Sequence, residues 1–71
     1  MPKLFSSAQI IAVLEENGFN FVSQKGSHMK YRTMSADKSL TVIVPANKRE
    51  IPHGTFRSIL RQSQLALEDF A

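Results

Sequence analysis

"QKGSHMKYR", residues 24–32, decides the fold, because it combines a turn signal with a strand that has two different faces. Lys25-Gly26-Ser27 is typical of a tight hairpin turn, where glycine adopts backbone angles that other residues avoid. The six residues that follow alternate in character, as they do in a strand with one apolar and one polar face. The apolar face would carry Met29, Tyr31 and Thr33, and the polar face His28, Lys30 and Arg32.

The segment before this hairpin has the signals of a helix over residues 7–17. Ser6 and Gln9 have the spacing of a capping box, and apolar residues at helical spacing follow them. Asn17-Gly18 ends the pattern, because Gly18 can take the left-handed conformation found after a helix. A strand over residues 19–24 then leads into the hairpin turn.

After the hairpin, residues 35–39 predict a polar turn and residues 40–44 a β-branched strand that Pro45 ends. A second helix is predicted over residues 52–62, and its start is ambiguous, because Pro52 suits a first helical position but Ile51 is a poor cap. Its apolar face carries Phe56, Ile59, Leu60 and Ser63, and another face carries Arg57 and Arg61. Residues 65–71 would add a short terminal turn.

This order of elements predicts a single α+β domain over residues 1–71. Two helices covering one face of a three-stranded antiparallel sheet make a two-layer sandwich. The other face of the sheet then lies in water. The alternation places His28, Lys30 and Arg32 together on that open face.

Composition restricts the classes of protein that the chain can belong to. It has 71 residues and no cysteine, so neither disulfides nor thiolate metal sites contribute to its stability. No apolar run approaches the roughly 20 residues of a membrane span, and the N-terminus lacks the pattern of a signal peptide. We therefore expect a soluble protein of the cytoplasm that does not bind membranes.

The positive charge is concentrated in the middle of the chain. Residues 25–61 hold eight basic and two acidic side chains, a net charge of +6, whereas the rest of the chain carries −3. A basic surface of this kind suits a polyanion such as RNA, since lysine and arginine release counterions when they bind phosphates. A solvated surface that keeps the protein soluble is the alternative.

The row of polar residues suggests a chemistry. RNA carries its own nucleophile, the 2′-hydroxyl, so its cleavage needs a proton acceptor, a proton donor and stabilisation of the charged phosphorus centre. A histidine beside lysine and arginine can meet these needs without a metal. The acidic residues form no carboxylate cluster that would suit Mg²⁺, and His28 and His53 do not have the spacing of metal ligands. The residues alone leave open whether His28 is an ordinary surface residue of a passive RNA-binding domain.

Four stretches of the chain resemble the HicA toxins of bacterial HicA–HicB toxin–antitoxin pairs. They are "NGF" (17–19), "QKGSHMKYR" (24–32), "VIVPANKREIPHGTFRSILRQ" (42–62) and "LEDF" (67–70). The resemblance implies a fold like that of double-stranded-RNA-binding domains and the activity of a ribosome-independent mRNA interferase that arrests growth. It also implies that His28 is essential, and that a HicB antitoxin covers it and can repress the operon with the toxin.

The chain also departs from the family pattern. Gln64 stands where the family has a helix-ending glycine, Ala66 where a serine or threonine often caps the last helix, and Met29 where many members have a basic or aromatic residue. His53 stands where lysine is common, which favours contact with a phosphate or a partner over a second catalytic role.

Together these observations predict a metal-independent endoribonuclease toxin that needs no cofactor and acts on mRNA. His28 would be the general acid or base, and Lys25, Lys30 and Arg32 would hold the scissile phosphate with help from Gly26 and Ser27. The alternatives are a non-catalytic domain that blocks translation by occupying RNA, and a degenerate toxin that only binds its antitoxin.

Overall fold

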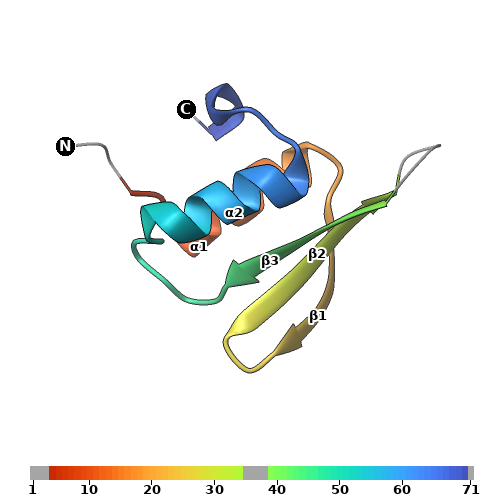
Figure 1. The fold of residues 1–71 in the computed structure, drawn as a ribbon. Helices are drawn as coiled ribbons and strands as arrows, with labels where there is room; N and C mark the ends of the chain where they lie inside the picture. The colour runs from red at the N-terminus through yellow and green to blue at the C-terminus, as the bar shows by residue number, and fades with distance from the viewer. Residues whose placement is uncertain (1–3, 35–38, 71) are drawn as a thin grey trace.

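The computed structural model describes residues 4–34 and 39–70, and its elements follow the predicted order (Figure 1). They are α1 (Ser7–Glu16), β1 (Asn20–Lys25), β2 (His28–Met34), β3 (Ser39–Pro45), α2 (His53–Ser63) and the short 3₁₀ helix η1 (Leu67–Phe70). The α+β class, with helix–sheet–helix order, is confirmed. Most of the turn predicted over residues 35–39 lies outside the described residues.

Both ends of α1 follow from local sequence signals. The Ser6 hydroxyl accepts a hydrogen bond from the Gln9 amide, and the Gln9 side chain accepts one from the Ser6 amide, so the capping box is present. At the other end Asn17 caps the helix, and Gly18 has φ +89°. Other residues would be strained in this left-handed conformation, whereas glycine adopts it readily. Gly18 therefore allows the chain to leave the helix at this point.

The bounds of α2 differ from the prediction by one residue at each end. Pro52 is the N-cap, with extended backbone angles, so the ambiguous start of the helix is at His53 and Pro52 is not its first residue. The helix continues to Ser63 and ends at Gln64, which has φ +60° and donates its amide to Leu60. Gln64 therefore adopts the left-handed conformation for which glycine is usually selected.

The three strands form one antiparallel sheet in the order β1-β2-β3. β2 is the central strand, and its residues pair with β3 without interruption from His28 opposite Pro45 to Met34 opposite Ser39. The pairing of β1 with β2 shifts between Phe21 and Ser23, so Val22 forms an irregularity of the β-bulge kind.

The hydrophobic core lies between the two helices and the β2–β3 half of the sheet. Its buried apolar members come from every element except β1, and they are Ile10, Leu14, Phe19, Tyr31, Val42, Val44, Ile51, Phe56, Ile59 and Phe70. Because the chain has no cysteine and so no disulfide, their burial is the main source of stability for these 71 residues.

β1 does not contribute to this core, contrary to the expectation that the helices cover one whole face of the sheet. All six of its residues are exposed, including Phe21 and Val22 at 53% and 45%. The reason is the sheet order: both helices pack on β3, and β1 is the strand farthest from them (Figure 1). The β1–β2 hairpin thus projects beyond the helices.

Candidate nucleic-acid interface

The turn between β1 and β2 is held from two sides. Gly26 has φ +60° and occupies the first central position of the two-residue loop, as in a type II′ hairpin. The Gln24 side chain donates a hydrogen bond of 3.0 Å to the Gly26 carbonyl. The Ala46 amide, from the loop after β3, donates one of 2.7 Å to the Ser27 carbonyl. These contacts fix the backbone immediately before His28.

Burial along β2 identifies which residues face away from the helices. Tyr31 is buried and pairs with Val42, which is also buried, so this pair faces the core. Side chains alternate along a strand, which places His28, Lys30 and Arg32 on the opposite face. His28 and Arg32 are exposed, and Lys30 is half-buried.

The sheet register sets the spacing of the basic groups around His28. Lys25 lies directly opposite His28, a position at which Cβ atoms are roughly 5 Å apart. Lys30 lies two residues further along the strand, a rise of about 7 Å, and Arg32 about 14 Å from His28. Two ammonium groups on flexible side chains can therefore reach a phosphate that sits beside the imidazole.

Arg32 is less free than the two lysines. Its Nε donates a long hydrogen bond of 3.4 Å to the Thr41 hydroxyl on β3. This contact favours a guanidinium that lies along the sheet surface, where a phosphate further along an RNA strand would contact it.

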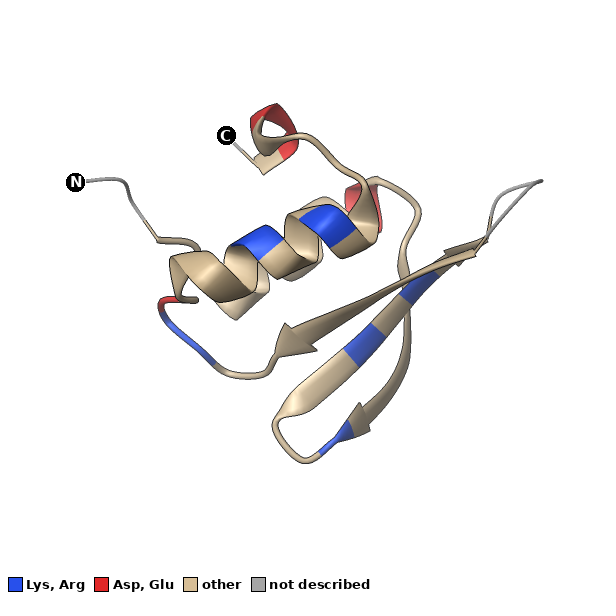
Figure 2. Ribbon diagram, viewed as in Figure 1, with Lys and Arg blue, Asp and Glu red and all other residues tan. Residues whose placement is uncertain are grey.

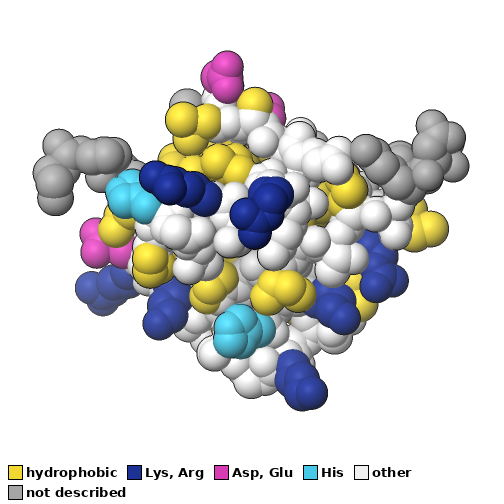
Figure 3. Space-filling model, in the orientation of Figure 1, with side chains coloured by type: hydrophobic (Ala, Val, Ile, Leu, Met, Phe, Trp, Pro, Cys, Tyr) yellow, Lys and Arg dark blue, Asp and Glu magenta, His cyan; other side chains and the backbone are white. Residues whose placement is uncertain are grey.

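The charges on the sheet have one sign. Basic residues occur on β1, on β2, on α2 and in the loop before α2, as the blue positions in Figure 2 show. Among residues 4–34 and 39–70, every acidic residue lies outside the strands: Glu15, Glu16, Glu50, Glu68 and Asp69. On the face drawn in Figure 3, dark blue side chains are spread across the front, whereas the magenta ones lie at the top and at the left edge. In the described part of the chain, no strand carries a carboxylate that would repel a polyanion at the sheet.

Tyr31 is a core residue, as predicted, and takes no part in this open face. Burial, and to a smaller extent the negative charge of Glu15, raise the pKa of its phenol above the usual value of 10.0. Its ring packs edge-on against Phe21, with centroids 5.7 Å apart. The Tyr31 hydroxyl is therefore not placed to exchange protons with a ligand beside His28.

The open face also contains residues that the sequence did not single out. Pro45 lies opposite His28, Ile43 opposite Lys30 and Ser23 on the other side of Lys30. The basic row is thus bordered by small and apolar side chains on which a ribose or a base can rest. Their period-two alternation is visible in the sequence, but only the register shows which of them adjoin His28.

Ser7 connects the N-terminus of α1 to the loop that supports the turn. It is buried, and its hydroxyl donates to the Pro45 carbonyl at 2.6 Å and accepts from the Lys48 amide at 3.0 Å. Its own amide donates to the Lys48 carbonyl at 2.9 Å. The sequence identified Ser7 only as the start of a helix, since nothing local signals a partner 41 residues away.

The arrangement has the components for acid–base chemistry on a phosphodiester. An exposed imidazole can exchange protons with a ligand, and the ammonium groups near it can stabilise negative charge. Among the described residues, no three His, Cys, Asp or Glu side chains gather into a group that could hold a metal ion.

Comparison with known proteins identifies a family to which the chain is similar. No curated protein is similar enough to be matched. No helix in the described part of the chain has the length and apolar character needed to cross a bilayer. The family described as the HicA toxin of bacterial toxin–antitoxin systems matches residues 7–65, a span that includes the turn, all three strands and α2. The chain therefore belongs to the HicA toxin family.

Proposed function

We propose that the protein is an endoribonuclease that cleaves mRNA with His28 as its catalytic residue, and so inhibits translation and growth. The observation that carries the proposal is the position of His28: exposed, directly after a fixed turn, on the uncovered face of the sheet and beside Lys25 and Lys30. Membership of a toxin family gives the biological context for such an activity.

The proposed reaction is an internal transfer followed by release. The imidazole of His28 removes the proton from a ribose 2′-hydroxyl, whose oxygen attacks the adjacent phosphorus. The bond from phosphorus to the 5′-oxygen breaks, and that oxygen receives a proton from the imidazolium or from water. The products are a 2′,3′-cyclic phosphate on one fragment and a 5′-hydroxyl on the other.

The remaining residues of the turn and strand would stabilise the transition state. Lys25 and Lys30 lie close enough to His28 to bind the non-bridging oxygens as their charge increases. Gly26 and Ser27 are exposed near the same point, so their amides and the Ser27 hydroxyl would assist, and Arg32 would hold a neighbouring phosphate. This chemistry requires neither a metal nor an organic cofactor.

The toxin–antitoxin context also implies a protein that controls the activity. We infer that a HicB-type antitoxin binds the toxin and covers His28, and that both proteins act in the cytoplasm, where mRNA is translated. An inhibitor that covers this face would meet a surface rich in Lys and Arg, so it would need carboxylates of its own.

The test is decay of a defined RNA by the purified protein in excess chelator. We expect cleavage of the ribose substrate, none at a position with a single 2′-deoxyribose, and loss of cleavage in His28→Ala. His53→Gln is the matched control, because it removes the other histidine, which is exposed at the start of α2. Chelator-sensitive cleavage, or full activity of His28→Ala, would falsify the mechanism.

The competing function is a non-catalytic domain that blocks translation by occupying mRNA. The same basic face supports it, because phosphate binding by Lys25, Lys30 and Arg32 needs no imidazole. Inhibition of translation with every transcript intact, and unchanged in His28→Ala, would establish occupancy instead of cleavage.

A further inference from the structure

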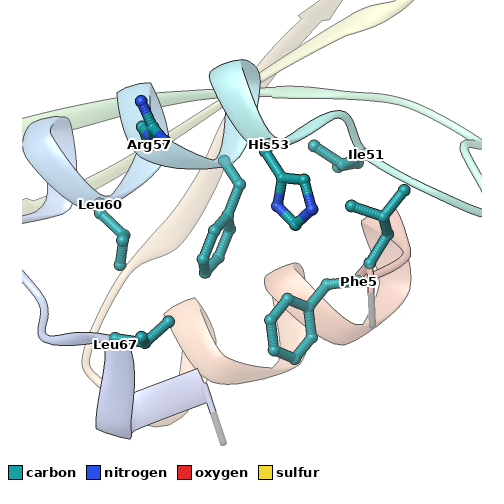
Figure 4. Close-up of a pocket in the computed structure, with 8 residues that line it drawn as sticks. Phe5, Ile51, His53, Arg57, Leu60 and Leu67 are labelled. Carbon is teal, nitrogen blue, oxygen red and sulfur yellow. The ribbon is translucent and has the colours of Figure 1, made fainter. Parts of the chain in front are cut away.

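We propose that a groove between α2 and η1 is a docking site for an acidic amphipathic segment of a partner protein. The groove has a volume of about 420 Å³, within the range of roughly 300–1,000 Å³ typical of binding sites (Figure 4). Six apolar side chains line it: Leu4, Phe5, Ile51, Phe56, Leu60 and Leu67. None of the residues proposed to bind RNA contributes to the lining.

The apolar floor is part of the hydrophobic core, and part of the wall of the groove is exposed. Phe5, Phe56 and Phe70 form a ring cluster beneath it, with Phe56 5.1 Å from each of the other two centroids. Leu67 on η1 is 60% exposed, although it lines the groove together with Phe5 and Phe56. A partner that covers Leu67 would remove apolar surface from water without any need to rearrange the core.

The charges along α2 indicate which kind of partner fits. The His53 ring points into the groove and Arg57 lies beside it on α2 (Figure 4), and Arg61 follows Arg57 one turn later on the helix. Residues four apart on a helix lie above one another, so these groups repeat at intervals of one turn. They match carboxylates that repeat every four residues along a partner helix whose apolar side chains enter the groove.

An RNA ligand fits this groove less well than a protein segment does. Its floor is apolar and offers no partner to a phosphate. On the far side η1 carries Glu68 and Asp69, so the acidic flank of a protein segment would face α2 and its uncharged side η1, whereas RNA has charge along its whole backbone. Since the chain belongs to a toxin–antitoxin family, we commit to a segment of the antitoxin as the occupant. The groove would give the antitoxin a second contact, separate from the face that carries His28.

The absence of tryptophan from the chain makes a simple binding assay possible. The probe is a 14-residue helical peptide with Trp and Leu on one face and Glu along one flank, compared with a twin peptide in which Lys replaces Glu. Entry of the Trp ring into the groove shifts its emission to the blue. We expect the Glu peptide to bind at least tenfold more tightly than its twin.

Two variants and one control decide the outcome. Arg57→Glu should invert the preference in favour of the Lys peptide. Leu67→Glu should lower the affinity for both peptides at least tenfold. If Leu67→Glu alters the circular dichroism spectrum, Leu67→Ala takes its place. Met34→Glu, at a site that is 77% exposed on β2, is the control for an added charge and should change neither affinity.

Three results would overturn the proposal: no emission shift with either peptide, a preference that Arg57→Glu leaves unchanged, or displacement of the peptide by an RNA oligonucleotide. Displacement by RNA would assign Arg57 to the nucleic-acid surface. Peptide binding is measured without RNA cleavage, so a failure of the proposed ribonuclease activity leaves this test intact.

Discussion

Replacing Ser7 with alanine tests the hydrogen bonds that join the start of α1 to the end of β3 and the loop after it. Ser7 is 4% exposed, and its hydroxyl is the donor to the Pro45 carbonyl and the acceptor for the Lys48 amide. Alanine removes both hydrogen bonds but keeps the backbone bond from residue 7 to Lys48 and adds no bulk. The change is therefore confined to the link between α1 and the loop after β3.

The size of the effect follows from what remains after the substitution. A buried polar group that loses its partner costs about 1–3 kcal/mol. The half-buried Pro45 carbonyl bears most of this cost, while water can replace the hydroxyl at the exposed Lys48. We expect a loss of about 2 kcal/mol, against a total stability of about 4–10 kcal/mol for a domain of this size. The melting temperature should fall by about 8–16 °C.

The assay is urea unfolding followed by circular dichroism, with Ser58→Ala as the matched control. The Ser58 hydroxyl makes a single long hydrogen bond of 3.3 Å to Gly54 within α2, so its loss should cost less than about 0.5 kcal/mol. If Ser7→Ala and Ser58→Ala are equally stable, the Ser7 hydroxyl does not connect α1 to the loop as described, and the reasoning fails.

Three further predictions concern the turn, the core and the basic face. Gly26→Ala should cost about 1–2 kcal/mol of unfolding free energy through its positive φ alone, whereas Gly54→Ala in α2 should not destabilise; equal losses would contradict this. Burial and the charge of Glu15 raise the pKa of Tyr31, so the neutral phenol stabilises the fold below the unfolded pKa, and this stability is lost as the pH rises through the folded pKa. Tyr31→Phe should not lose stability at alkaline pH in this way. Identical profiles of stability against pH for the two proteins would refute the prediction. Lys30→Gln should make the negative slope of log affinity for single-stranded RNA against log salt shallower by about 0.7, and an unchanged slope would remove Lys30 from the phosphate contacts.

Local signals in the sequence were sufficient to predict most of the elements. The capping box at Ser6 and Gln9, the glycine after α1 and the alternation along β2 depend on residues a few positions apart, and each is present. The basic row around His28 was predictable for the same reason, since alternation alone places His28, Lys30 and Arg32 on one face.

Long-range features were not predictable in this way. The exposure of β1 depends on where both helices pack, and its irregularity at Val22 depends on the register with β2. The hydrogen bond from Ala46 to Ser27 joins residues from different parts of the chain, and neither residue type signals it. Gln64 ends α2 in a conformation that its side chain does not favour, so a rule based on glycine could not locate that end.

The central claim is that one imidazole on the open face of the sheet performs the chemistry. The most direct test is the single-turnover rate of RNA cleavage in excess chelator for wild type, His28→Ala and His53→Gln. General acid–base catalysis contributes about 10²- to 10⁴-fold, so we predict a loss of that size in His28→Ala and wild-type rates in His53→Gln. A His28→Ala protein that is correctly folded and cleaves within threefold of wild type would contradict the account.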